Sequence, residues 1–309
     1  MKAKKPKVIF RDLNGILLLN KPLGLSSNAA LQRARFIFRA RKAGHTGSLD
    51  PQATGVLPLC FGEATKVSGY LLDSDKRYTT TVQLGQTSTT GDTEGEILNS
   101  TPVTEFSDET LQTVLDQFTG SIVQIPPMFS ALKHNGTPLY KLARKGIEVE
   151  RKQRKVTIYE LNLLSRTTDT LQLDVRCSKG TYIRTLAQDI GDTLGFGAYI
   201  TSLERTEVSP FDCSKIYTLE ELEAMLEQQP DESLLDSALL PLDTALSHHP
   251  QIILDSAEAS RIRNGLKVAR HDIPNAPLIR VYDESGEFIG IGRFSSDGLL
   301  APKRMMRTN

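Results

Sequence analysis

Apolar runs and helical periodicity alternate along the N-terminal part of the chain. Residues 15–20 (GILLLN) form a short apolar run that predicts a buried strand, ended by Lys21-Pro22. Ser26 and Ser27 then provide N-caps for a helix over about 28–40, in which apolar residues recur every three or four positions. Residues 43–55 are rich in Gly, Thr and Pro, and therefore predict a loop.

Alternation of apolar and polar residues predicts strands further along the chain. It covers 78–84 (YTTTVQL), 156–164 and 170–177, and the last two runs form a hairpin around 167–169. The remaining patterns predict helices over 63–72, 108–118, 139–145 and 181–194, and irregular structure over 121–138 and 229–243. The elements lack the regular spacing of βαβ units, so the pattern predicts an α+β fold with a mixed or antiparallel sheet.

The pattern changes from about residue 250. One short helix (256–263) is followed by three short strands (278–282, 287–294 and 299–305) that are separated by tight turns. About 60 residues can form a small β-barrel-like module, but a marginal one that needs support from its neighbour. The predicted organisation is a basic N-terminal tail (1–11), a large α+β domain (12–249) and a small C-terminal domain (250–309).

The charges balance overall but are segregated along the chain. Lys+Arg and Asp+Glu number 37 each among the 309 residues, so the composition does not indicate a generic polyanion binder. Residues 1–11 and 33–42 each carry five basic side chains and no acid, and 133–155 carries eight against two acids. The balancing acids gather in 216–243, whose role stays open. The basic tracts predict a phosphate-binding face, unless each is simply a solvated helix face or loop.

Several classes of protein are excluded by what the sequence lacks. The longest apolar run is far too short to span a membrane, and the N-terminus has no apolar signal-peptide core. The three cysteines are widely spaced and none of the five histidines has a Cys, Asp or Glu at ligand spacing. Nucleotide-binding glycine loops are also missing. We therefore expect a cytoplasmic protein without a metal, a cofactor or a membrane partner.

The segment with the most candidate chemistry is 41–55 (RKAGHTGSLDPQATG). Its glycines and proline predict specific turns, and loops of this kind often carry functional side chains. Asp50 directly precedes Pro51, which forces it into an extended conformation and directs its carboxylate away from helix capping. The alternatives are that Asp50 only braces an Asx-turn, and that His45 is a buried histidine bonded to the backbone.

A second such segment is 177–186 (CSKGTYIRTL), which runs from a strand through glycine into a helix. It places Tyr182 and Arg184 at the helix start, where an arginine can pair with a carboxylate or a phosphate. Tyr78 and Tyr182 lie in polar surroundings and could stack on an unpaired base. The alternatives are a structural ion pair for the arginine and ordinary packing for the tyrosines.

Long motifs identify a family that the chain resembles. Segments KPLGLSS (21–27), GHTGSLDPQATGVLPLCFGEATK (44–66), DSDKRY (73–78), PPMFSALKHNGTPLYKLARKG (126–146) and CSKGTYIRTLAQDIG (177–191) closely resemble the TruB family of tRNA pseudouridine synthases, in the family's order. The resemblance covers roughly 12–210, while 250–309 looks like the family's short PUA-type RNA-binding domain. It implies a monomer that isomerises uridine 55 in the T arm of tRNA to pseudouridine, with neither metal nor cofactor.

The resemblance also implies roles for single residues. Asp50 matches the nucleophile, whether it attacks the sugar or C6 or assists elimination, and Arg184 would keep it ionised by pairing with it. Tyr78 would stack on the flipped uracil and is placed to move a proton. Tyr182 and Leu203 would line the base pocket, and His45 would fill the space left by the splayed loop bases.

Two other functions fit the same resemblance. One is a non-catalytic tRNA-binding or folding chaperone of the same fold, which the intact Asp50, Tyr78 and Arg184 argue against. The other is the sister class of synthases that acts with guide RNA, which the compact C-terminal domain and the absence of long Lys-rich tails argue against.

Overall fold

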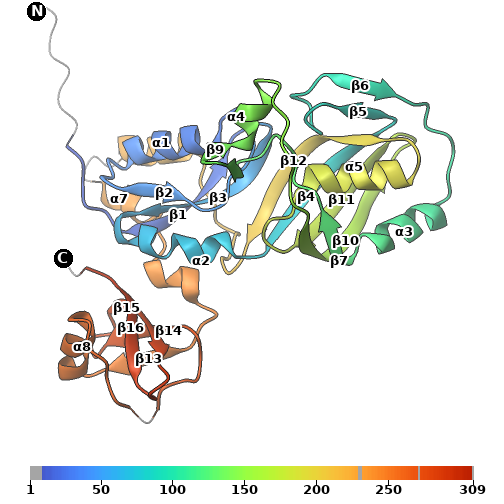
Figure 1. Cartoon of the computed structure of the whole chain (residues 1–309). Coiled ribbons are helices and arrows are strands. Elements are labelled where there is room, and N and C mark those ends of the chain that lie inside the picture. Colours follow the sequence, from blue (N-terminus) through green and yellow to red (C-terminus); the bar gives the residue numbers. More distant parts are fainter. Residues whose placement is uncertain (1–8, 229–231, 271, 308–309) are drawn as a thin grey trace, which may run out of the picture.

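A mixed eight-stranded sheet runs through the N-terminal four fifths of the molecule (Figure 1). The computed structural model describes residues 9–228, 232–270 and 272–307. The strand order is β1-β3-β12-β4-β11-β10-β7, with β2 paired to β3, and every pairing is antiparallel except that of β12 with β3. The strands are β1 (Gly15–Lys21), β2 (Ala43–His45), β3 (Ala53–Phe61), β4 (Lys76–Leu84), β7 (Gly120–Gln124), β10 (Arg154–Arg166), β11 (Thr170–Cys177) and β12 (Ala198–Val208). The predicted α+β fold with a mixed sheet is confirmed.

Helices and two small hairpins surround this sheet. The hairpins pair β5 (Gln86–Ser88) with β6 (Ile97–Ser100), and β8 (Lys133–His134) with β9 (Thr137–Pro138). The helices are α1 (Ser27–Ile37), α2 (Ser68–Leu72), α3 (Asp108–Gln117), α4 (Leu139–Ala143), α5 (Ile183–Thr193), α6 (Leu219–Gln228), α7 (Ser233–Asp236) and α8 (Ser256–Arg263), with 3-10 turns η1 (Gly62–Lys66) and η2 (Leu242–Leu246). Ser26 caps α1 as predicted, because its hydroxyl accepts the Ala29 N–H at 3.2 Å.

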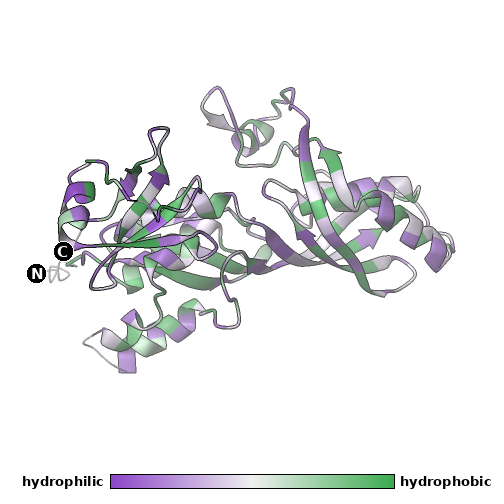
Figure 2. Ribbon diagram, turned by 90° about the horizontal axis from the view of Figure 1, so that it is seen from below, coloured by the Kyte–Doolittle hydropathy of each residue, from purple (hydrophilic) through white to green (hydrophobic). Residues whose placement is uncertain are grey.

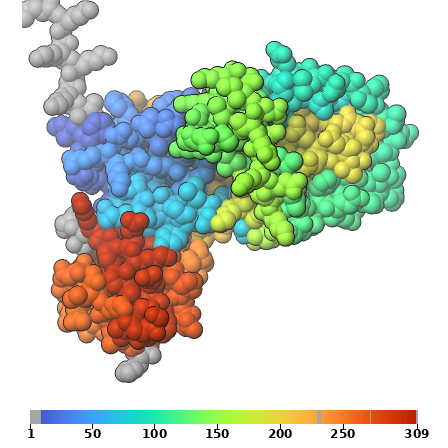
Figure 3. All heavy atoms as spheres, in the orientation of Figure 1, coloured from blue at the N-terminus to red at the C-terminus, as the bar shows by residue number. Residues whose placement is uncertain are grey.

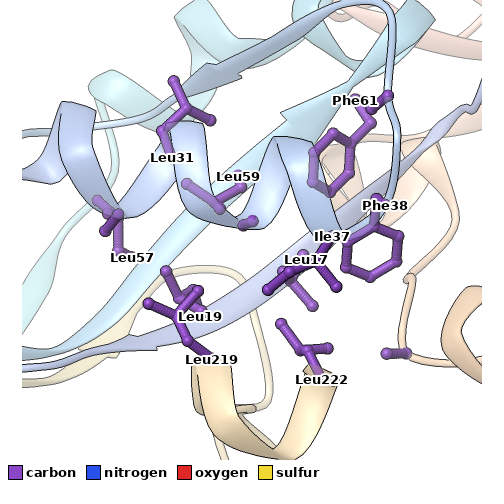
Figure 4. Packing of buried hydrophobic residues seen from close by; sticks show 14 of the residues in the cluster. Leu17, Leu19, Leu31, Ile37, Phe38, Leu57, Leu59, Phe61, Leu219 and Leu222 are labelled. Atoms are coloured by element: carbon purple, nitrogen blue, oxygen red, sulfur yellow. The ribbon is translucent and has the colours of Figure 1, made fainter. Parts of the chain in front are cut away.

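A hydrophobic core packs on each half of the sheet. Figure 2 shows two lobes joined by long strands that pass from one to the other. In the first lobe, α1 and α6 pack on β1 and β3 through the leucines and phenylalanines of Figure 4, such as Leu17, Leu59 and Leu222. In the second lobe, α3 and α5 pack on β4, β10 and β11. Tyr78 and Leu203 contact both cores, so β4 and β12 join the two lobes.

The C-terminal module is an open sheet packed against the first lobe (Figure 3). Its strands lie in the order β13 (Gln251–Leu254), β14 (Ile279–Asp283), β15 (Phe288–Phe294) and β16 (Leu300–Met305), without barrel closure over the described residues. Three of these strands and α8 were predicted to within about two residues, and β13 was not. Ile291 and Met306 share a core with Leu71 and Leu246, which is the support that so small a module needs.

Tertiary pairing overrides several local predictions. The predicted loop 43–55 contains β2 and the start of β3, because residues 43–45 pair with the other end of β3. The predicted helix 63–72 is divided into η1 and α2, and the predicted loop 121–138 contains β7 and the β8–β9 hairpin. The predicted irregular segment 229–243 contains α7, and its residues 229–231 lie outside the described part.

Gly55 is the glycine on which the centre of the sheet depends. Its φ is +97°, and a Cβ atom added there would lie 2.2 Å from the carbonyl oxygen of Arg205 on the neighbouring β12. Gly136 also has a positive φ, of +80°, but an added Cβ would meet nothing within 4 Å.

We predict that Gly55→Ala lowers the free energy of unfolding by at least about 3 kcal/mol, since left-handed strain and overpacking add together. The control Gly136→Ala carries only the strain and should lose no more than about 2 kcal/mol. Urea unfolding followed by circular dichroism measures both. Equal losses for the two variants would contradict the close approach of β3 and β12.

Candidate active site

The loop between β2 and β3 presents Asp50. The Ser27 hydroxyl accepts the Leu49 N–H at 2.7 Å and donates to the Leu49 carbonyl at 2.9 Å, so the residue before Asp50 is held from both sides. The Gly24 N–H donates to the Pro51 carbonyl at 2.8 Å, and the Ala53 N–H closes a turn on the Asp50 carbonyl at 3.0 Å. The backbone around Asp50 is therefore fixed by the 21–27 segment.

Arg184 lies buried in the first turn of α5 and reaches Asp50. Its guanidinium pairs with the Asp50 carboxylate at 2.9 Å and with Asp92 at 3.3 Å. It also donates to the carbonyls of Thr90 at 2.8 Å and Phe129 at 2.7 Å. The arginine thus binds carboxylates. The Asp50 carboxylate forms this ion pair and makes no Asx-turn hydrogen bond within the described residues.

Burial and charge oppose each other at Asp50. Burial has the largest effect and raises the pKa of the Asp50 carboxyl, Arg184 and Lys21 lower it, and Asp92 raises it further. Arg184 thus favours the ionised carboxylate, as expected, but the pKa is still above its ordinary value. The Lys21 ammonium donates to the carbonyls of Pro22 at 2.9 Å and Leu25 at 2.7 Å, and burial lowers its pKa to about 8.

A cavity of about 560 Å³ opens beside the Asp50–Arg184 pair. This volume is within the range of small-molecule pockets. The cavity is lined by Gly47, Ser48, Leu49, Asp50, Leu72, Lys76, Tyr78, Ser130, Ala131, Leu132, Ser178, Gly180, Thr181, Tyr182, Ile183, Arg184, Leu203 and Arg205. Five of the six predicted site residues are in this set, so the structure brings them together around one space.

His45 is the predicted site residue that does not line the cavity. It lies half-buried on β2, opposite Leu59 of β3. Its buried Nδ1 has no hydrogen-bond partner among the described residues, and burial lowers the pKa of the imidazole. The interpretation of His45 as a histidine bonded to the backbone therefore has no support at this nitrogen.

The two tyrosines stand on different elements of the cavity wall. Tyr78 is partly buried on β4, and burial raises the pKa of its hydroxyl. Tyr182 is the extended N-cap residue of α5 and not its first helical residue, which corrects the helix start to Ile183. Its N–H donates to the Gln124 side chain at 3.0 Å, and the Arg154 guanidinium lies 5.5 Å from its ring centre.

Three polar residues of the site were not predicted as site residues. Asp92 is the second carboxylate on Arg184, and Lys21 and Arg205 are both fully buried close to the Asp50 loop. Lys21 and Arg205 occur in the segments KPLGLSS and YITSLERT, but their burial is not visible in the sequence. Asp92 follows a glycine in a polar stretch, TGDTEG (90–95), which gave no periodic signal.

The two basic tracts within the described residues differ in how their charges are used. In 33–42, Arg33 pairs with Glu223, Arg39 with Glu232 and Arg41 with Asp12, while Arg35 donates to backbone carbonyls. In 133–155 the side chains of Lys133, Lys141, Arg144, Lys145, Lys152 and Lys155 are exposed, and no ion pair is formed by them among the described residues. The second tract therefore offers positive charge to a partner, and the first mostly neutralises acids of its own chain.

The described residues contain no helix long and apolar enough to cross a bilayer. They also contain no group of three or more His, Cys, Asp or Glu side chains placed to hold a metal ion.

Comparisons with known proteins identify the family of the chain. Residues 35–183 match the N-terminal domain of the TruB family of pseudouridylate synthases, 184–247 match the tRNA pseudouridylate synthase B C-terminal domain, and 250–306 match the C-terminal domain of pseudouridine synthase II TruB. The chain is 54% identical over 302 residues to tRNA pseudouridine synthase B of Pseudomonas fluorescens (strain Pf0-1) and 50% identical over 305 residues to that of a Marinomonas species (strain MWYL1). Both alignments cover 98% of each chain.

Solved structures share the fold at lower identity. A Cbf5–Nop10–Gar1 complex matches with a TM-score of 0.70 and 25% identity, over 90% of this chain and 78% of the other. An H/ACA RNP bound to a substrate RNA containing 2′-deoxyuridine matches with a TM-score of 0.72 and 22% identity, over 96% of this chain and 85% of the other. By its sequence relatives and its domain matches, the chain belongs to the TruB family of pseudouridine synthases.

Proposed function

We propose that this chain isomerises uridine 55 in the T arm of tRNA to pseudouridine, with Asp50 as the nucleophile. The observation that carries the proposal is the Asp50 carboxylate at the cavity wall, held at 2.9 Å by a buried arginine. The relatives at 50–54% identity are named tRNA pseudouridine synthase B, which supports tRNA as the substrate.

The cavity suits a single flipped nucleotide. Its volume of about 560 Å³ can take one base with its sugar. Tyr78 and Tyr182 offer aromatic faces to the uracil, and Leu203 offers an apolar edge. Extruding a base costs a few kcal/mol, least where the base already lies in a hairpin loop, as in the T arm.

The reaction needs a carboxylate and a proton carrier. The N1–C1′ bond breaks, a C5–C1′ bond forms, the C5 proton leaves and N1 gains a proton. Asp50 can attack C1′ or C6, or assist elimination, in its ionised form, which Arg184 and Lys21 favour. Tyr78 keeps its hydroxyl proton at neutral pH, because burial raises its pKa, and is placed to move protons at the base.

The proposal extends to the partner surfaces. The exposed basic side chains of 133–155 would contact phosphates of the T arm, and the module 250–309 would add contacts to the rest of the tRNA. Guide-RNA-dependent action receives less support, since identity to the Cbf5 chain is 25% against 54% for a tRNA pseudouridine synthase B. The enzyme would act as a monomer in the cytoplasm.

Asp50→Asn should reduce pseudouridine formation below detection, because it removes the charge and the nucleophilic oxygen. Binding of a T-arm hairpin should stay within about tenfold of the wild type, or about 1.4 kcal/mol. Single-turnover tritium release from C5-labelled uridine RNA and filter binding measure the two effects. Substantial tritium release would overturn the nucleophile assignment, since asparagine would serve a merely bracing role equally well.

Tyr78→Phe keeps the stacking face and removes the hydroxyl. We expect hairpin binding close to that of the wild type and a single-turnover rate lowered by about 100-fold or more. The same two assays measure this. A normal rate would restrict Tyr78 to stacking.

As the pH is lowered, the single-turnover rate should begin to fall at a higher pH than it would if Asp50 had the ordinary pKa of a carboxyl group. Protonation removes the nucleophile, so activity is lost as pH falls through the raised pKa of Asp50. Asp92→Asn removes a charge that raises this pKa, so the acid limb of the single-turnover pH profile should move to lower pH.

The matched control for this shift is Asp189→Asn. Asp189 lies on α5, as Arg184 does, and has its pKa raised to about 6, but it does not line the cavity. Its replacement should leave the acid limb in place. A shift in the control and none in Asp92→Asn would contradict the electrostatic coupling at Asp50.

The quadruple change of Lys141, Arg144, Lys145 and Lys152 to Gln should flatten the salt dependence of hairpin binding. Each lost phosphate contact lowers the slope of log K against log salt by about 0.7 to 0.9. The control Arg33→Gln with Arg41→Gln should leave the slope unchanged, because acids of the same chain already pair with both side chains. An unchanged slope in the quadruple variant would make 133–155 a solvated surface.

A further inference from the structure

Arg205 is a buried charge without a counter-ion among the described residues. It is the largest fully buried side chain of the described part, with 1% of its surface exposed. No carboxylate among those residues forms an ion pair with it, whereas Arg184 has two. An unpaired cation in the interior is costly, so its retention calls for a role beyond packing.

The strand pairing places Arg205 at the centre of the site. β12 lies between β3 and β4, and Arg205 is in register with Tyr78 on one side and Gly55 on the other. Its Nε–H donates to the Val56 carbonyl at 2.7 Å and its Nη2–H to the Gly47 carbonyl at 3.2 Å. The Arg205 guanidinium and the Tyr78 side chain, which come from paired positions on neighbouring strands, both form part of the cavity wall.

We infer that Arg205 is a positioning residue that orients the Tyr78 hydroxyl toward the substrate and stabilises it when its proton is transferred. A guanidinium has donors and no acceptor. In a hydrogen bond between the two side chains the phenolic oxygen must therefore be the acceptor, which leaves the hydroxyl hydrogen directed away from the guanidinium. The inference rests on the proposed role of Tyr78 in proton transfer.

The surroundings of Tyr78 explain why a cation is needed there. The groups that face it are Arg205 on β12, Cys177 on β11 and Asp50 in the loop. Burial, Cys177 and Asp50 all raise the pKa of the hydroxyl, and Arg205 lowers it. Among these groups, the guanidinium is the one that favours the phenolate.

The same guanidinium also connects the tyrosine to the nucleophile. Its bond to the Gly47 carbonyl holds the loop that leads to Asp50, while the backbone of Arg205 pairs with that of Tyr78 on β4. Arg205 thus connects the element that carries the proton carrier with the loop that carries the carboxylate.

Two variants of similar size separate charge from packing. Arg205→Gln is neutral but can still donate to the backbone carbonyls, and Arg205→Lys keeps the charge. The full-length protein is labelled with 3-fluorotyrosine, whose more acidic phenol titrates at lower pH, and the Tyr78 signal is assigned from Tyr78→Phe by fluorine NMR.

The titration needs neither tRNA nor activity. Arg205→Gln should raise the pKa of residue 78 by about 1 or more, and Arg205→Lys should keep it closer to the wild-type value. If the glutamine variant does not fold, Arg205→Met takes its place as the neutral variant. The same pKa in the neutral and charged variants would overturn the inference.

Kinetics provide the second measurement. Arg205→Gln should lower the single-turnover rate on saturating tRNA by about 100-fold while tRNA affinity stays within about threefold, and Arg205→Lys should recover at least part of the rate. A wild-type rate in Arg205→Gln would overturn the inference, as would a loss confined to affinity. If the wild-type protein leaves uridine 55 unmodified, the proposed function fails, whereas the titration still tests Arg205.

Arg176→Gln is the matched control. Arg176 lies on the neighbouring β11, pairs with Glu160 at 3.1 Å and has its guanidinium 5.5 Å from the ring centre of Tyr159. The substitution should move the Tyr159 signal and leave the pKa of Tyr78 and the rate unchanged. A change at Tyr78 as large as that in Arg205→Gln would mean that the effect is not specific to Arg205.

Discussion

The insertion of β12 between β3 and β4 is the constraint on which the site depends. β12 runs parallel to β3 and antiparallel to β4, and so joins the two lobes of the sheet. Leu203 and Arg205 on this strand face the cavity together with Tyr78 on β4, and the loop that carries Asp50 leads into β3. The close approach of the strands is possible because Gly55 has no side chain where β12 passes.

Two buried arginines have different electrostatic effects in the site. Arg184 holds two carboxylates and two carbonyl oxygens, so its charge is balanced and its geometry fixed. Arg205 donates to two carbonyl oxygens and forms no ion pair with a carboxylate of the described residues, so its positive charge acts on Tyr78 without being cancelled. The first arginine favours the ionised form of the proposed nucleophile, and the second favours loss of a proton from the proposed proton carrier.

The basic side chains of the two tracts differ, although the charges of the chain balance: some pair with acids of the same chain, and others are exposed and unpaired within the described residues. Net charge is zero, and in the tract 33–42 three arginines pair with acids that include Glu223 of α6 and Glu232 beside α7. The acidic segment 216–243 thus pairs with α1 and the residues that follow it, through Glu223 on α6 and Glu232 beside α7. The tract 133–155 keeps exposed charges and directly follows the cavity residues Ser130 and Leu132 in the chain. This is expected of a segment that contacts a polyanion.

Local pattern and family motifs determined much of this protein from its sequence. Apolar runs, period-two alternation and caps predicted β1, α1, β4, β10, β11 and three of the C-terminal strands, because those signals depend on neighbouring residues. The motifs also pointed to Asp50, Tyr78, Tyr182, Arg184 and Leu203, which line one cavity. Only the tertiary structure decided the pairing of β12, the second carboxylate on Arg184 and the position of Arg205. These contacts join distant residues, such as Arg205 and Val56 at a separation of 149 positions. Desolvation depends on what surrounds a group in three dimensions, and periodicity along the chain carries no record of it.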